Sequence, residues 1–114
     1  MTKQIFIRFK QRTAKPIGSV SVVATYDKKA LRLTTPFLVW VKDFKQLNPK
    51  GIPNNPEEAT PSAKATSKKL QDFRATVYQT AQALVASDDW ETSTSKEFSK
   101  LVISRWEAAG NKAE

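Results

Sequence analysis

The chain has 114 residues, of which 39% are hydrophobic and 26% charged, with a formal net charge of +8 at pH 7; this composition is typical of one folded domain and not of a disordered chain. It contains no cysteine and no histidine, which excludes disulfides, thiolate or imidazole metal ligands, and nucleophiles activated by histidine. No apolar run approaches the ~20 residues of a membrane-spanning helix, and the N-terminus lacks a signal-peptide pattern, so we expect a soluble, cytoplasmic protein.

The first part of the chain alternates between apolar and polar residues as β-strands do. Three segments show the pattern, residues 3–11, 19–26 and 30–35. A connection with Pro16 and Gly18 separates the first two, and a short polar turn at residues 26–29 separates the last two. We predict a three-stranded antiparallel meander. Pro36 is expected to end its third strand, because proline has no amide hydrogen for the ladder.

Residues 37–44 are apolar and aromatic, with Trp40 and Phe44 expected to cover one face of the sheet and residues 41–44 to form one helical turn. Four prolines between residues 45 and 63 are typical of a mobile surface linker. We therefore divide the chain into a basic sheet at residues 3–47, a Pro/Asn-rich linker at 48–63, and a helical pair at 64–109. That pair either packs on the sheet or leads to a following domain.

Two amphipathic helices are predicted in the last part of the chain. Apolar residues recur every three or four positions from Leu70 to Leu84, which indicates a helix from Ser62 or Thr66 to Ala86. Thr94 and Glu97 have the spacing of a capping box, and a second helix follows that ends at Gly110. Its apolar stripe is expected to contain Phe98, Leu101, Val102, Arg105 and Trp106.

Strands that precede helices predict an α+β fold, in which a three-stranded antiparallel sheet packs on the long C-terminal helix and a short second helix follows. A sheet of this size is marginal alone, so one helix must cover its apolar face. The three tryptophans, Trp40, Trp90 and Trp106, are expected in the core or between the helices.

The net charge belongs to the N-terminal part of the chain. Residues 1–45 contain ten basic and two acidic side chains, a net charge of +8, whereas residues 46–114 contain nine of each. A charge that served general solubility would be spread evenly. Its concentration on the predicted sheet indicates a surface that binds a polyanion.

The polar side of the sheet offers groups that suit double-stranded DNA. Basic side chains can bind guanine edges or phosphates, hydroxyls can bind bases or backbone, and strands can enter the major groove. If the apolar side faces a helix, the open side carries Gln4, Phe6 and the strand residues of our candidate set, while Lys28 and Lys29 stand at a hairpin tip. The candidate DNA-binding residues are Arg8, Lys10, Arg12, Ser21, Thr25, Lys28, Lys29, Arg32 and Thr34.

Other interpretations stay open. The same residues can be the solvated face of an antiparallel sheet, and Phe6 can pack under the linker instead of contacting a base. Lys64, Lys68 and Lys69 at the start of the long helix either contact phosphates or are solvated. Binding of RNA or single strands and a protein-interaction module are the alternative functions.

Catalytic and metal sites are not expected. The acidic pairs Glu57–Glu58 and Asp88–Asp89 lie in loops without a nearby ligand set, and a chain with three glycines has no glycine-rich phosphate loop. An enzyme would have to use carboxylates, lysine and tyrosine alone. We therefore expect a protein that is not an enzyme, with no cofactor, no metal, no small-molecule substrate and no membrane contact.

The order of these features resembles a known family. The chain combines a basic N-terminal sheet, a strand ending in Thr34-Thr35-Pro36, the segment from Trp40 to Phe44, a Pro/Asn linker, a long helix and a short capped helix. In this order the features resemble the N-terminal arm-type-site DNA-binding domain of tyrosine recombinases. These are the phage and conjugative-transposon integrases, particularly those of Bacteroides-like bacteria. The similarity spans about residues 3–107 and rests on organisation, not on a signature motif.

The resemblance implies a sheet inserted into the major groove of arm-type sites during DNA integration and recombination of a mobile element. Arg8, Lys10, Ser21, Thr25 and Arg32 would be the readers. The family's catalytic domain needs arginines, a histidine and a nucleophilic tyrosine. Because this chain has no histidine and only two tyrosines, we expect either a piece of a longer integrase, which would contact other integrase protomers through its remainder, or a free-standing relative.

The sequence departs from the family's pattern in the first hairpin connection. Residues 12–18 are short on glycine and contain Pro16. The register between the first two strands therefore stays open, and with it which face of the sheet is basic.

Overall fold

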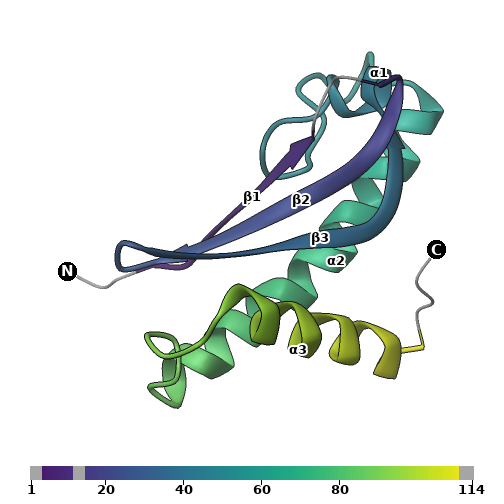
Figure 1. Cartoon of the computed structure of the whole chain (residues 1–114). Helices are drawn as coiled ribbons and strands as arrows, with labels where there is room; N and C mark the ends of the chain where they lie inside the picture. The colour runs from purple at the N-terminus through teal and green to yellow at the C-terminus, as the bar shows by residue number, and fades with distance from the viewer. Residues whose placement is uncertain (1–3, 12–14, 111–114) are drawn as a thin grey trace.

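The computed structural model describes residues 4–11 and 15–110. Three antiparallel strands lie in the order β1–β2–β3, and the helices follow (Figure 1). The elements are β1 (Phe6–Gln11), β2 (Ile17–Tyr26), β3 (Lys29–Trp40), α1 (Val41–Phe44), α2 (Pro61–Ala86) and α3 (Ser95–Ala108). The predicted α+β fold, with a meander, a long helix and a short one, is confirmed.

The core lies between the sheet and the two long helices. Alternate strand residues, such as Ile7, Val22 and Leu31, are buried against one stripe of α2 that contains Leu70 and Phe73. Helix α3 packs across α2 and β3 (Figure 1). A second sheet face is left without a helix. Sheet and helices therefore share one apolar core, which a sheet of this size requires for stability.

Aromatic side chains join the three layers of this core. Phe37 on β3 meets Phe73 on α2 edge to face, with ring centroids 5.7 Å apart, and both meet Trp106 on α3, at 5.9 and 5.2 Å. Trp90 contacts Tyr26 and Phe98 in the same way. Such edge-to-face contacts are favoured by the ring quadrupole. Trp90 and Trp106 thus lie in the core, as predicted.

Strand β3 continues through Pro36, so the prediction that Pro36 ends the strand is wrong. The pairing shifts at this point: Ser21 faces Thr34, but Ser19 faces Leu38. Three residues of β3, residues 35–37, therefore oppose the single residue 20 of β2. A proline is tolerated in such a bulge, where the ladder is already interrupted, and the Thr35 hydroxyl accepts a hydrogen bond from the Phe37 N–H at 3.4 Å.

Trp40 is not in the core, contrary to the prediction, because the alternation along β3 continues unbroken past Pro36, with Phe37, Val39 and Val41 inward and Trp40 outward. Its side chain is 47% exposed, and the Lys42 ammonium lies 5.7 Å from the ring centroid. The predicted stripe of α3 is also too wide. Phe98, Val102 and Trp106 are buried at intervals of four, whereas Leu101 and Arg105 are exposed.

Helices α2 and α3 both begin with a side-chain cap. Thr60 caps α2 by accepting a hydrogen bond from the Ala63 N–H at 3.2 Å, with Pro61 in the first turn. The predicted capping box of α3 is confirmed, since Thr94 and Glu97 each bind the other's backbone N–H. No helix within residues 4–11 and 15–110 is long and apolar enough to cross a bilayer.

The proline-rich segment expected as a linker packs against the sheet and α2. The Pro49 carbonyl accepts a hydrogen bond from the Phe9 N–H of β1 at 2.7 Å, and the Ser67 hydroxyl of α2 donates to the Gly51 carbonyl at 2.6 Å. At the opposite edge of the sheet, the Arg32 N–H donates to the Ser95 hydroxyl at 3.0 Å. Each edge strand is thus partly covered, which protects it from pairing with other chains.

Replacement of Gly51 by alanine should destabilise the fold through two effects. Its φ of 81° belongs to the left-handed region, and an added Cβ would lie 3.2 Å from the Phe9 ring and 3.3 Å from the Leu70 Cβ. We expect Gly51→Ala to lower the free energy of unfolding by about 2–4 kcal/mol, from backbone strain and overpacking together, as measured by urea denaturation.

Gly110 supplies the matched control. Its φ is 92°, but nothing lies within 4 Å of an added Cβ. Gly110→Ala should therefore cost only the backbone strain, about 1 kcal/mol. Equal losses in the two variants would contradict the close packing of the loop on Phe9 and Leu70.

Candidate nucleic-acid interface

Two arginines flank a valine in one row across the three strands. Arg8 of β1 pairs with Val23 of β2, which pairs in turn with Arg32 of β3. Both arginines are exposed and Val23 is half-buried, on the face that no helix covers. Since neighbouring strands are about 4.8 Å apart, the two arginine Cα atoms are separated by about 10 Å. Arg8 and Arg32 thus project from one face, and the question of which face is basic is settled.

The next row carries further polar groups. Lys10, Ser21 and Thr34 pair across the strands, and this row and the arginine row border a shallow hollow of about 500 Å³. The row on the other side contains Phe6, Thr25 and Ala30, and the Phe6 side chain is 60% exposed. We call these outward residues the open face: Phe6, Arg8, Lys10, Ser21, Val23, Thr25, Ala30, Arg32 and Thr34.

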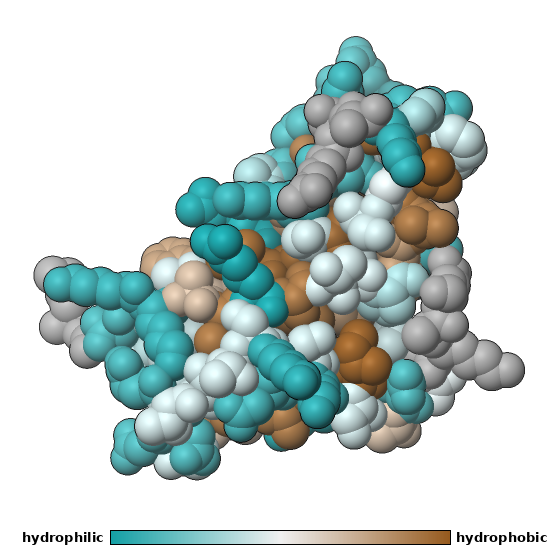
Figure 2. Space-filling view, in the orientation of Figure 1, coloured by the Kyte–Doolittle hydropathy of each residue, from teal (hydrophilic) through white to brown (hydrophobic). Residues whose placement is uncertain are grey.

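The open face is positively charged because the strands contain no aspartate or glutamate. Asp43, just beyond β3, is 2% exposed and accepts a hydrogen bond from the Ser62 hydroxyl at 2.6 Å, so it points into the fold. Figure 2 is seen from the side of the open face and shows many hydrophilic residues, with hydrophobic ones in the centre, at the upper right and near the lower edge. Charges concentrated in this way attract polyanions over a distance.

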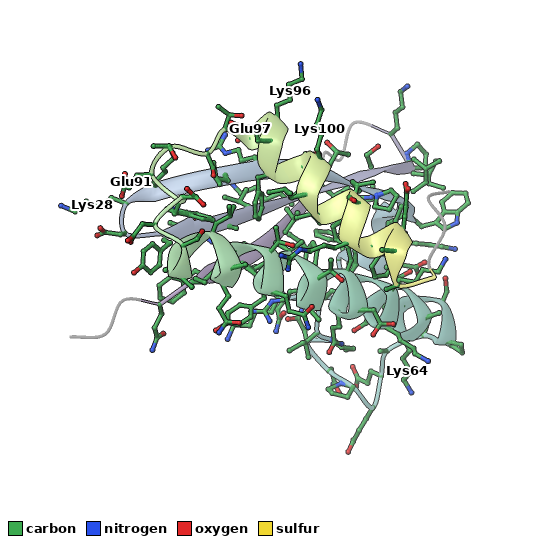
Figure 3. All side chains as sticks on the ribbon, turned by 90° about the horizontal axis from the view of Figure 1, so that it is seen from below. Lys28, Lys64, Glu91, Lys96, Glu97 and Lys100 are labelled. Atoms are coloured by element: carbon green, nitrogen blue, oxygen red, sulfur yellow. The ribbon has the colours of Figure 1, made fainter. Side chains whose placement is uncertain are left out.

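Lys28 and Lys29 at the β2–β3 turn extend in different directions, although both were predicted to bind DNA. Asp27 and Lys28 both have positive φ, 47° and 71°, as a two-residue hairpin turn requires. Lys28 is exposed and extends from the tip (Figure 3). Lys29 points to the helix side, where its ammonium donates to the carbonyls of Glu91 and of Ser93, the latter at 2.9 Å.

Seven of the nine candidate residues are therefore at the open face or its tip, Arg8, Lys10, Ser21, Thr25, Lys28, Arg32 and Thr34. Lys29 ties the hairpin to the loop between α2 and α3 instead. Arg12 lies outside the described residues. Gln4, also expected on this side, is exposed next to Phe6.

The sequence-based candidates missed three residues near this face. Val23 lies between the arginines, and its place could be found only from the strand register. Lys96 and Lys100 of α3 project on the side of the sheet opposite α2 (Figure 3), next to β3, because Ser95 binds the Arg32 backbone. Lys64, by contrast, extends on the α2 side (Figure 3).

The far end of the same face is apolar. Ile17 pairs with Trp40, and Leu38 lies beside Ser19; Leu38 is 64% exposed. In the part of the chain that the structure describes, no group of three or more acidic, histidine or cysteine side chains could hold a metal ion. The open face and its apolar end thus offer positive charge, hydroxyl groups and apolar side chains, which can all contact a ligand.

Comparison with protein-family models, with curated proteins and with solved structures found no match. The interpretation of the open face therefore depends on its own geometry and chemistry.

Lys29 and Lys28 should differ in their effects on stability. We expect Lys29→Ala to lower the free energy of unfolding by about 1 kcal/mol, because it removes charge-assisted hydrogen bonds from a half-buried group. Lys28→Ala should leave stability within about 0.5 kcal/mol, as an exposed substitution does. Denaturant titrations of both variants measure this, and a larger loss for Lys28→Ala would overturn the assignment.

Proposed function

We propose that the chain binds double-stranded DNA with the open face of its sheet in the major groove. The observation that supports it best is the row Arg8–Val23–Arg32. Arginine binds the O6 and N7 atoms of guanine with two hydrogen bonds, and an aliphatic side chain between two such arginines can contact a thymine methyl group. The hydroxyls of Ser21, Thr25 and Thr34 can both donate and accept, so they suit bases and phosphates alike.

The dimensions of the sheet support the same proposal. The Cα atoms of the outer strands lie about 10 Å apart, and the major groove is about 12 Å wide. A sheet of this width fills the groove, so its two edges face the sugar-phosphate backbones. Lys96 and Lys100 beside β3 can then neutralise phosphates of one DNA strand, while the open face contacts base edges.

We further propose that the natural ligand is an arm-type site of a tyrosine recombinase, used in DNA integration by a mobile element. The order of a basic meander, an aromatic segment after β3 and two helices supports this narrower assignment. In this proposal the chain contributes DNA binding without catalysis, works in the cytoplasm, and belongs beside other integrase protomers.

The test compares a preferred duplex, selected from a random-sequence library, with random duplex of the same length. We expect Arg8→Ala and Arg32→Ala each to weaken the preferred duplex by about 5- to 150-fold, equivalent to 1–3 kcal/mol, and random duplex much less. Lys64→Ala, which removes a charge on the α2 side, is the control and should change neither affinity more than about twofold. Fluorescence anisotropy at several salt concentrations gives the affinities.

Other outcomes would favour other functions. Equal losses on both duplexes would make Arg8 and Arg32 phosphate contacts, and stronger binding of single strands in direct competition would favour the single-strand alternative. Failure to bind any nucleic acid at low salt would favour a protein-interaction module, with Leu38 and Trp40 as its first candidates. Amide shifts of the labelled chain with duplex must map to the open face; shifts confined to α2 and α3 would contradict the proposal.

A further inference from the structure

A cleft of about 720 Å³ lies beside the outer edge of β1. Phe6 and Arg8 of β1 and Thr25 of β2 line it on the sheet side, Pro49 and Lys50 line it on the loop side, and Arg74 of α2 also contributes to the lining. The loop is held in place here by the hydrogen bond from the Phe9 N–H to the Pro49 carbonyl. The cleft is therefore built from four segments of the chain: β1, β2, the loop around Pro49 and α2.

The charge of this cleft is entirely positive. Arg8, Lys50 and Arg74 are among its lining residues, and no aspartate or glutamate is. The Nε atom of Arg74 is buried and has no hydrogen-bond partner within the described residues. A buried donor of a charged group without an acceptor is costly and uncommon in folded proteins. Together with Arg8 and Lys50, Arg74 gives the cleft a lining of three cations and no carboxylate, which favours an anionic ligand.

The position of the cleft identifies the anion. Phe6, Arg8 and Thr25 belong both to the cleft and to the open face. When the open face lies in the major groove, the edge of β1 runs beside one backbone of the duplex. We propose that this cleft binds a phosphodiester group of that DNA strand through Arg74 and Lys50. The inference rests on the proposed function and deepens it.

The chemistry of Arg74 suits this ligand. A guanidinium group binds phosphate oxygens with two parallel hydrogen bonds, which fixes orientation as well as charge. Contacts of this kind set the register of a protein on the duplex without reading its sequence. The cleft beside β1 and the lysines Lys96 and Lys100 beside β3 would thus hold opposite edges of the sheet on the two backbones, while Arg8 and Arg32 contact bases between them.

The experiment measures duplex affinity for Lys50→Ala, Arg74→Ala and Arg74→Lys. We expect Arg74→Ala to weaken the preferred and the random duplex by the same factor, about five- to tenfold near physiological salt, and to reduce the slope of log K against log salt by about 0.9. Lys50→Ala should act in the same way. Arg74→Lys should retain the salt slope but recover only part of the affinity, because lysine keeps the charge without the paired donors.

Lys68→Ala is the matched control, because Lys68 is an exposed cation of the same helix that lines a different hollow with Pro53. Its loss reports the general effect of removing one positive charge. A denaturation midpoint close to that of the wild-type chain would show that Arg74→Ala folds normally. Arg74→Lys serves as the second variant if the alanine chain is unstable.

The outcomes separate this inference from the proposed function. If the wild-type chain binds duplex and Arg74→Ala changes the affinity and the salt slope no more than Lys68→Ala does, the proposed phosphate-binding site is wrong and the proposed function stands. If Arg74→Ala weakens the preferred duplex more than the random one, Arg74 reads bases and the inference is overturned. Failure of the wild-type chain to bind duplex would overturn both.

Discussion

The packing of α2 against one face of a three-stranded sheet is the constraint on which the rest of the structure depends. A sheet of three strands cannot bury enough apolar surface by itself, and one helix can cover only one of its faces. Leu70, Phe73, Val77 and Ala81 supply that cover. The opposite face is left open, and the outward side chains of all three strands gather there.

The arginine row follows from this constraint in two steps. Burial of Ile7, Phe9, Leu31 and Leu33 forces Arg8 and Arg32 outward, because successive strand residues point to opposite faces. The register then places both arginines at the same height, with Val23 between them. A shift of the strand register by one residue would send the basic side chains to the apolar side. The core packing that stabilises the fold therefore also keeps the basic side chains on one face.

The two edges of the sheet have a related role. The loop around Pro49 partly covers β1, and Ser95 at the start of α3 binds the backbone of β3. These contacts limit pairing with other chains, and they also bring Lys50, Arg74, Lys96 and Lys100 beside the open face. The same packing therefore covers the two edges of the sheet and places basic side chains beside them. A duplex, with its two negatively charged backbones, matches this arrangement.

Local patterns were sufficient for the elements and their inward residues. Alternation predicted the meander and the outward direction of Arg8 and Arg32, periodicity predicted α2, and the Thr94–Glu97 spacing predicted the cap of α3. They failed where the ladder is irregular. The bulge opposite Val20 carries β3 through Pro36, because proline is excluded only from regular central pairing. Trp40 then lies on the outward side of the continued strand.

The amino-acid sequence by itself determined the fold class, the segregation of charge to the N-terminal part, and the side of each strand that enters the core, since these depend on periods of two and 3.6 residues. Only the tertiary structure decided that Lys29 binds the loop between α2 and α3 instead of pointing to the open face. It also decided that Val23 lies between two arginines and that Arg74 lines a cleft beside β1. Those relations join residues far apart in the chain, and they arise from strand register and helix packing, which no local pattern encodes.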